Sequence, residues 1–268
     1  MKTIIVLTDF SSAADAALAY AASLASATGS TIFLLNVYQL PITMNELPLM
    51  MIPVNDLKAT ADMGLSRVKA EAEKKFAGVS FKTESRLGDA GEEIEGIVKE
   101  QETLCIVTGT EKLSGFENFL LGNDALSLMK NSSHPVIAVP EGTTATAPKN
   151  IVVAIDDSDA DEIPVQKIMS FMDALKAQLH IVHVQTDDEE MPTSEQRLAE
   201  LFAPLPTTYH AVKNNNVAEG IKNFLLENRA DLLLLLPHKH NLFERLFFKG
   251  HTAEIVAEVS LPVVCINV

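Results

Sequence analysis

The sequence predicts two α/β domains of the doubly wound type, each with a parallel five-stranded sheet. Three observations lead to this fold class. Lys2–Ser11 (KTIIVLTDFS) and Lys149–Ser158 (KNIVVAIDDS) are versions of one phrase, 147 positions apart (149 − 2 = 147). Leu104–Gly122 is repeated by Leu232–Gly250 at an offset of 128 (232 − 104 = 128). In both copies strand-like apolar runs alternate with helix-like runs, which is typical of parallel sheets covered on both faces.

The first copy carries recognisable signals for each element in turn. A Ser12-x-x-Asp15 capping box opens an Ala-rich helix, and Gly29 closes it. Short apolar runs rich in β-branched residues predict the strands. We expect strands at residues 3–7, 32–37, 79–86, 104–108 and 136–139, and helices at 12–28, 56–76, 90–100 and 122–130.

The second copy repeats this plan after a short connection. We expect a first domain at residues 1–140, a linker at 141–148 (EGTTATAP) and a second domain at 149–268. Ser158-x-x-Asp161 is expected to cap the first helix of the second domain. The five leucines of 232–236 predict a strand that is buried on both faces.

Composition excludes several classes of function. The chain has 268 residues and a formal net charge of −15, which opposes docking onto nucleic acid or anionic membranes. No apolar run approaches the roughly 20 residues of a membrane helix, and the amino terminus shows no signal-peptide pattern. Cys105 and Cys265 lie in apolar runs, so we expect buried thiols in a reducing cytoplasm.

The segment after the fourth strand contains the most informative polar motif. It reads Gly109-Thr110-Glu111-Lys112, then nine residues, then Gly122-Asn123. Ligands of doubly wound sheets bind beyond the carboxyl ends of the strands, where the strand order reverses. A glycine at a strand end permits close approach of a ligand, and a glycine at a helix start leaves N–H groups free for an anion.

This motif resembles the G-x2-G-x9-G-[ST] nucleotide loop of the universal stress protein family, in its tandem form. Thr8-Asp9-Phe10-Ser11 is similar to the TDFS-type segment of that family, and Asn36-Val37 stands at its usual His-Val. The resemblance covers essentially the whole chain. It implies that Val136–Val139 pairs with Val263–Ile266, so that the two domains form a pseudo-dimer within one chain, and it leaves a further homo-oligomer open.

The resemblance also implies a ligand, ATP or AMP, in the first domain only. It places Asp9 and Val37 on the adenine and ribose side, and Gly109 beneath the ribose. Two positions of the motif differ from the family pattern: Lys112 either fills the site or acts as a cation on the phosphates, and Asn123 can still donate a hydrogen bond. The candidate nucleotide-binding residues are Thr8, Asp9, Val37, Gly109, Lys112, Gly122 and Asn123.

The second copy departs further from the motif. Pro237 stands at the first glycine and His240 at the second, and only Gly250 persists. Proline removes an N–H donor and fixes φ, and the acidic run Asp187–Glu190 would repel a triphosphate. We therefore expect no nucleotide in this half.

Two other features offer alternatives. His238, His240 and His251 are candidate metal ligands, although three histidines near one loop also line polar pockets. The segment 38–53 (YQLPITMNELPLMMIP) is apolar and rich in methionine, which suits a flap on its own domain or an adaptable contact surface.

No constellation of nucleophile, base and acid is evident, and GxxxxGK[ST] is absent. We therefore expect a cytoplasmic, non-enzymatic stress-response regulatory protein. Slow ATP turnover abolished by Gly122→Val would indicate an enzyme instead. The other alternative is a nucleotide-free scaffold that binds a protein partner, a metal or a small apolar ligand through residues 38–53 or the three histidines.

Overall fold

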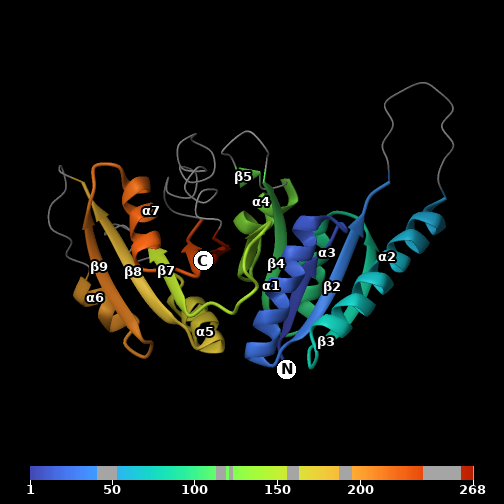
Figure 1. The fold of residues 1–268 in the computed structure, drawn as a ribbon, viewed down its shortest axis with the longest axis horizontal. Coiled ribbons are helices and arrows are strands. Elements are labelled where there is room, and N and C mark those ends of the chain that lie inside the picture. Colours follow the sequence, from blue (N-terminus) through green and yellow to red (C-terminus); the bar gives the residue numbers. More distant parts are fainter. Residues whose placement is uncertain are drawn as a thin grey trace, which may run out of the picture.

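The computed structural model describes residues 1–40, 53–112, 119–120, 123–155, 163–186, 195–237 and 261–267. Within these residues the chain forms two α/β halves that lie side by side (Figure 1). Residues 141–149 connect the halves and contain neither helix nor strand. Among the described residues, none of the helices combines the length and apolarity needed to cross a bilayer.

Strands and helices alternate in both halves. The first half contains β1 (Thr3–Leu7), α1 (Ser12–Thr28), β2 (Thr31–Tyr38), α2 (Val54–Lys75), β3 (Ser80–Leu87), α3 (Ala90–Glu100), β4 (Thr103–Lys112), β5 (Phe119–Leu120), α4 (Asn123–Asn131) and β6 (Val136–Pro140). The second half contains β7 (Asn150–Ala154), α5 (Val165–Leu175), β8 (Gln178–Gln185), α6 (Glu195–Leu201), β9 (Thr207–Lys213), α7 (Val217–Glu227), β10 (Leu232–Leu235) and β11 (Val263–Cys265).

The two halves have the same strand order. It runs β3-β2-β1-β4-β6 in the first half and β9-β8-β7-β10-β11 in the second, and all neighbours within a half are parallel. In each half the order reverses between the first and fourth strands, at β1/β4 and at β7/β10. The predicted fold class and the repeat are therefore confirmed.

The last strands of the two halves pair with each other, as the resemblance implied. Val263 lies opposite Ala138, Val264 opposite Ile137 and Cys265 opposite Val136, in antiparallel register. The ladder joins the two five-stranded sheets into one continuous sheet. Because the strand order repeats on either side of the ladder, the sheet is still a duplicated unit.

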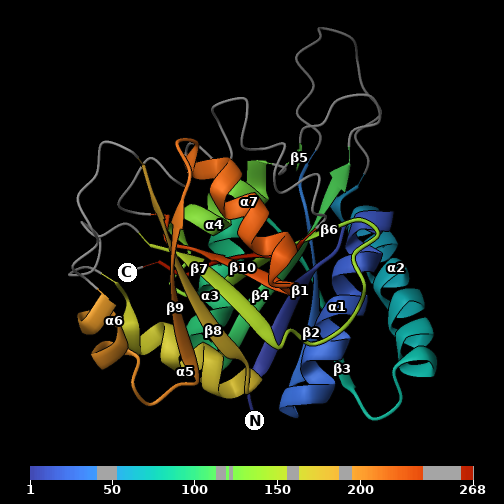
Figure 2. The ribbon, with the colours of Figure 1, turned by 60° about the vertical axis from the view of Figure 1, so that its left-hand side comes forward.

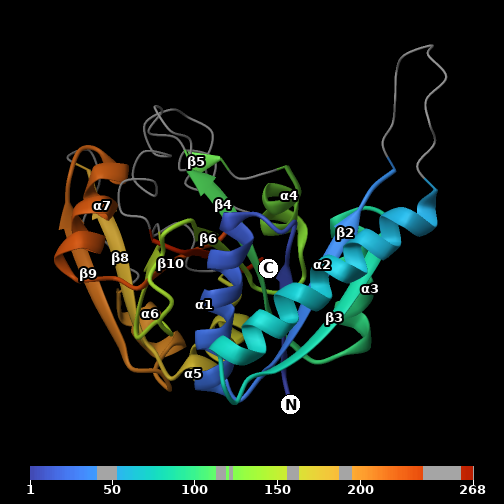
Figure 3. The same ribbon diagram turned by 45° about the vertical axis from the view of Figure 1, so that its right-hand side comes forward.

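Helices cover both faces of this sheet. One face is packed by α1, α2, α5 and α6, and Figure 3 shows α1 and α2 lying across the strands of the first half. The opposite face is packed by α3, α4 and α7. Helix α7, near the centre of Figure 2, contacts β8 and β9. Each apolar layer contains residues of both halves, so the core continues through the junction. Cys105 and Cys265 are free thiols buried in it, as expected.

Two helix starts differ from the sequence prediction. The N-cap of α1 is Ser11, one residue before the predicted Ser12, and its Oγ accepts a hydrogen bond from the Ala14 N–H at 3.2 Å. Helix α5 begins at Val165 after Pro164, which provides no side-chain cap. Helical backbone is disfavoured at the residue before a proline, here Ile163, so α5 begins only after Pro164. Ser158 and Asp161 themselves lie outside the described residues.

Candidate functional site

The carboxyl ends of β2, β1 and β4 meet at one edge of the sheet. The N–H of Thr8 donates to the Leu35 carbonyl at 3.0 Å, which extends the β1–β2 pairing by one residue. Val6 is paired with Val107 on the other side, so Thr8, which follows β1, lies next to Gly109 within β4. Four predicted site residues thus come together at the point where the strand order reverses: Thr8, Asp9, Val37 and Gly109.

The turn after β1 is held by its own side chains. Thr8 is buried, and its Oγ1 accepts a hydrogen bond from the Phe10 N–H at 3.1 Å. Oδ1 of Asp9 accepts from the Ser11 N–H at 3.0 Å, which leads the chain into α1. Phe10 has a φ of 67°, in the left-handed region that side chains other than glycine rarely adopt. Asp9 is exposed, so one carboxylate oxygen fixes the turn and the other remains available at the edge.

Asn36 links β2 to this turn. Its Nδ2 donates to the Thr8 carbonyl at 2.7 Å, and the side chain is buried. In the second half His183, 147 positions later, lies with Nδ1 3.3 Å from the Ile155 carbonyl. The two side chains differ in chemistry but occupy equivalent places: Asn36 contacts the residue after β1, and His183 contacts the residue after β7. Sequence reasoning had treated Asn36 only as a family variant, although the shared offset was a signal that could have revealed this role.

Gly109 lies against the first turn of α1. A Cβ built on Gly109 would overlap the carbonyl group of Ala13 and lie 2.8 Å from the Ala14 nitrogen. The absence of a side chain is therefore required for α1 to pack against β4. The sequence interpretation gave this glycine a role in ligand approach, and the structure adds a packing role that holds with or without a ligand.

The fourth strand is longer than predicted. It continues through Gly109 and Thr110, which pair with Val139 and Pro140 of β6. Beyond them, Glu111 pairs with Leu120 and Lys112 with Phe119, so β4 and β5 form an antiparallel ladder. The prediction that a loop begins at Gly109 is therefore wrong. Pairing to β6 on one side and to β5 further along keeps the backbone extended.

The remaining candidate residues are only partly described. Lys112 lies at the end of β4 and Asn123 at the start of α4, whereas Gly122 lies outside the described residues. The same is true of the metal candidates His238, His240 and His251, and of most of the segment 38–53. Pro237 follows β10 as expected. Among the described residues, no group of three or more His, Cys, Asp or Glu side chains is arranged to hold a metal ion.

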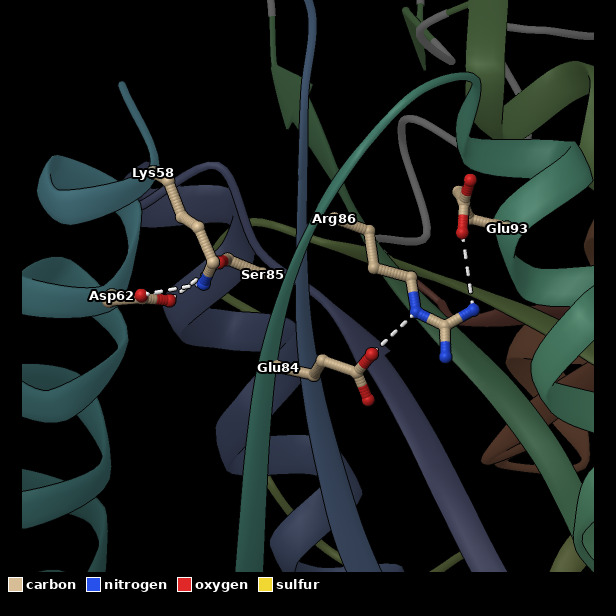
Figure 4. Close-up of polar contacts among 6 residues, drawn as sticks. All are labelled: Lys58, Asp62, Glu84, Ser85, Arg86 and Glu93. Carbon is tan, nitrogen blue, oxygen red and sulfur yellow. Dashed lines mark hydrogen bonds and ion pairs between the residues drawn. The ribbon is translucent and has the colours of Figure 1, made fainter. Parts of the chain in front are cut away.

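A network of polar side chains on α2 and β3 was not predicted from the sequence. Nζ of Lys58 on α2 lies 2.8 Å from Asp62 Oδ2, and Ser85 Oγ on β3 donates to Asp62 Oδ1 at 2.5 Å (Figure 4). The hydrogen bond from Lys58, followed by that from Ser85, lowers the pKa of Asp62. These exposed charges tie α2 to β3 with little net gain in stability.

Arg86 extends this network toward α3. Its Nε lies 2.7 Å from Glu84 Oε1 and its Nη1 lies 3.1 Å from Glu93 Oε2 (Figure 4). The pKa of Arg86 is raised, first by its hydrogen bond to Glu84. Asp89 caps α3 nearby through the N–H groups of Gly91 and Glu92. These contacts connect the outer strand β3 to α2 on one side and to α3 on the other.

The comparisons with known proteins agree with this architecture. The sequence profile of the Universal stress protein family matches residues 1–140 and 185–267, which is more than half of the chain. No curated protein matches the chain.

Several solved structures match over nearly the full length. A universal stress protein from Archaeoglobus fulgidus DSM 4304 is 18% identical, with a TM-score of 0.74 over 99% of this chain and 98% of that chain. A functionally unknown protein from Pseudomonas aeruginosa PAO1 is 16% identical, with a TM-score of 0.58 over 100% of this chain and 92% of that chain. At these identities the likeness concerns the fold. With the profile match over both halves, the chain belongs to the universal stress protein family and is of the tandem type.

Proposed function

We propose that this protein is a stress-response regulatory protein whose first half binds an adenine nucleotide, ATP or AMP. The observation that carries the proposal is the convergence of Thr8, Asp9, Val37 and Gly109 at the carboxyl ends of β1, β2 and β4. That place is the reversal point of the strand order, which is where doubly wound sheets bind ligands.

Each side chain has a proposed part in holding the nucleotide. The exposed carboxylate of Asp9 accepts hydrogen bonds from the ribose or adenine, and the half-buried Val37 provides an apolar contact for the base. Gly109 lies beneath the ribose. Gly122 and Asn123 bind the phosphates with backbone N–H groups at the start of α4, where a helix favours an anion. Lys112, at the end of β4, pairs with the phosphates if its side chain turns inward.

The second half is proposed to lack this site. Pro237 follows β10 where Gly109 lies in β4 of the first half, and proline has no N–H to offer a ligand. The nucleotide would thus act on one half, and the β6–β11 ladder would transmit its effect to the other. We further propose that the protein has no enzymatic activity, because the Thr8 hydroxyl and the Asp9 carboxylate each accept a hydrogen bond from a main-chain N–H of the turn and no hydrogen bond between them activates a nucleophile.

Calorimetry with ATP and with AMP tests the proposal. Asp9→Asn keeps an oxygen for the Ser11 N–H but removes the charge, so we expect the turn to persist and nucleotide affinity to fall about tenfold. Asp15→Asn is the matched control, because it removes the same charge from an exposed position in the first turn of α1. Absence of heat at millimolar ATP and AMP would contradict nucleotide binding. ATP hydrolysis by the purified protein would contradict a purely regulatory role.

A second candidate function rests on exposed apolar side chains. Leu40, Val54 and Leu87 are between 40% and 47% exposed. Leu40 follows β2, Val54 is the first residue of α2, and Leu87 ends β3 opposite Tyr38 of β2. Such a group favours contact with a small apolar ligand. Fluorescence of an apolar dye would test this role: Val54→Ser should lower the signal, and an unchanged signal would reject it.

A further inference from the structure

A cavity lies at the junction of the two halves, on the opposite edge of the first sheet from the candidate nucleotide site. Its volume is about 320 Å³, which is at the lower end of the range for small-molecule pockets. Lys2, Thr103 and Pro135 line it from the amino ends of β1, β4 and β6. Lys167 and Ser170 line it from α5 of the second half, which contacts α1 near the lower end of the molecule in Figure 1.

The cavity is positively charged in a strongly acidic protein. Lys2 and Lys167 line it, and no Asp or Glu is among the described residues of its wall. Nζ of Lys167 donates to the main-chain carbonyl of Asn267 at 3.0 Å, so its charge is held by a neutral acceptor. Neither lysine takes part in an ion pair within the described part of the chain. Two lysines therefore line the cavity, and among the described residues no carboxylate lines it with them.

Neutral groups in the wall offer hydrogen bonds. The Ser170 hydroxyl and the Gln166 amide line the cavity, and neither has a side-chain hydrogen bond to a described residue. Thr103 lines it too, but its Oγ1 donates to the Gln101 carbonyl at 3.3 Å. Ser133 also lines it; its Oγ donates to Glu95 at 3.2 Å and lies 3.0 Å from His134 Nδ1. Glu95 contacts Ser133 but does not itself line the cavity.

The second copy provides an internal comparison. At the offsets of the repeat, Tyr20 corresponds to Lys167 (20 + 147 = 167) and Asp231 to Thr103 (103 + 128 = 231). Tyr20 is 2% exposed, and its pKa is raised by burial first and then by Cys105 and by the charge of Asp231. Oδ2 of Asp231 accepts hydrogen bonds from the Lys149 and Asn150 N–H groups, both at 2.9 Å. The equivalent place, formed by Asp231 of the second half and Tyr20 of the first, thus has a carboxylate and a buried phenol where the cavity has the hydroxyl of Thr103 and the ammonium group of Lys167.

We propose that this junction cavity binds a phosphate group, either free orthophosphate or the phosphate of a small monoester. A dianion matches the two ammonium groups, which form no ion pair within the described part of the chain, and the Ser170 hydroxyl and the Gln166 amide can bind its oxygens. The volume exceeds that of orthophosphate and includes an apolar wall from Leu104 and Phe171 for an organic substituent. Since Lys2 and Lys167 come from different halves, the ligand would link the two domains.

Calorimetry of the full chain with orthophosphate and with glycerol 3-phosphate, against chloride at matched ionic strength, tests the proposal. Lys2→Gln and Lys167→Gln should each weaken binding about tenfold or more, because each removes a charge-assisted hydrogen bond. Lys149→Gln is the matched control: it removes the same charge at the position equivalent to Lys2, where the side chain is exposed, and should leave binding unchanged. Tighter binding of glycerol 3-phosphate would identify a monoester site, and tighter binding of orthophosphate a free-phosphate site.

A second readout locates the ligand. His134 lines the cavity, so its imidazole NMR signals should shift on addition of phosphate, whereas those of His180 and His210 should not. Asp9→Asn should leave phosphate binding intact, which separates this site from the proposed nucleotide site. Absence of binding by both phosphates, equal loss in Lys149→Gln, or an unshifted His134 would each overturn the proposal.

Discussion

The ring of Phe10 packs against the backbone of Gly64, so the turn after β1 and the middle of α2 fit together only without a side chain at residue 64. A Cβ on Gly64 would lie 2.6 Å from Cζ of Phe10. Glycine inside a 22-residue helix costs about 1 kcal/mol relative to alanine, so this packing opposes the helix preference. The contact fixes α2 against the turn that carries Asp9.

Gly64→Ala should destabilise the protein by about 1 kcal/mol. Overpacking costs about 1–3 kcal/mol, and the better helix propensity of alanine offsets part of it. Gly96→Ala in α3 is the matched control, because its Cβ would lie 3.8 Å from Arg86 Nη1, an ordinary contact. That variant should gain up to about 1 kcal/mol. Urea unfolding measures both, and equal effects of the two variants would contradict the Phe10 contact.

Gly109→Ala should be more harmful than Gly64→Ala. Its Cβ would overlap main-chain atoms of Ala13, which no rotamer change can relieve. We expect a loss of about 3 kcal/mol or more in the free energy of unfolding, or failure to fold. Urea unfolding and circular dichroism measure this loss, and near-normal stability would show that α1 can move away from β4.

Asn267 should be important for the junction of the halves. Its buried Nδ2 donates to the carbonyls of Met129 at 3.2 Å and of Ser132 at 2.8 Å, both in the first half. Asn267→Ala would leave those carbonyls without this donor, at a cost of about 1–3 kcal/mol in unfolding free energy. Asn131→Ala, which removes an exposed bond to the Ser127 carbonyl, should cost less than about 0.5 kcal/mol. Similar losses in the two variants would count against a role in the junction.

Stability should fall as the pH is lowered through about 6.5, the ordinary pKa of histidine. His180 Nδ1 and His210 Nε2 lie 2.8 Å and 3.0 Å from Thr208 Oγ1, and 3.4 Å from each other. Burial lowers the pKa of both imidazoles, and His210 lowers that of His180 further. Because the unfolded chain then binds more protons than the folded one, the stabilisation is complete above the unfolded pKa and is lost toward the folded pKa.

Urea unfolding at pH 7.5 and 5.5 measures this pH dependence. The double variant His180→Gln, His210→Gln should show a smaller loss between the two pH values, with a residual part from His134, whose pKa burial also lowers. An unchanged pH dependence in the double variant would assign the effect to other groups.

The repeat offsets predicted the fold because a strand that is buried on both faces remains a continuous apolar run in both copies, even where the rest of the sequence differs. They placed β1, β2, β4 and β6 and their counterparts, and the resemblance placed the β6–β11 ladder. Local signals were less exact: the cap of α1 lies at Ser11, and β4 continues to Lys112 because its neighbours pair with it.

The candidate site was predictable only where it depends on the order of the strands. Thr8, Asp9, Val37 and Gly109 come together because strand order dictates it, and strand order follows from the fold. Two other features depend on how α1 packs against β4 and how the two halves pack against each other. They are the contact of Gly109 with Ala13 and the presence of Lys2 and Lys167 in the wall of one cavity. Neither the spacing of residues nor a sequence motif predicts such tertiary contacts.

The antiparallel ladder between β6 and β11 also limits how copies of this protein can associate. Each half uses its last strand in this ladder, so that strand edge is occupied within the chain. The outermost strands are β3 and β9, and β3 carries Lys82, Glu84 and Arg86, which discourages edge-to-edge growth of the sheet. Because both strands of the ladder belong to one chain, this contact does not depend on protein concentration.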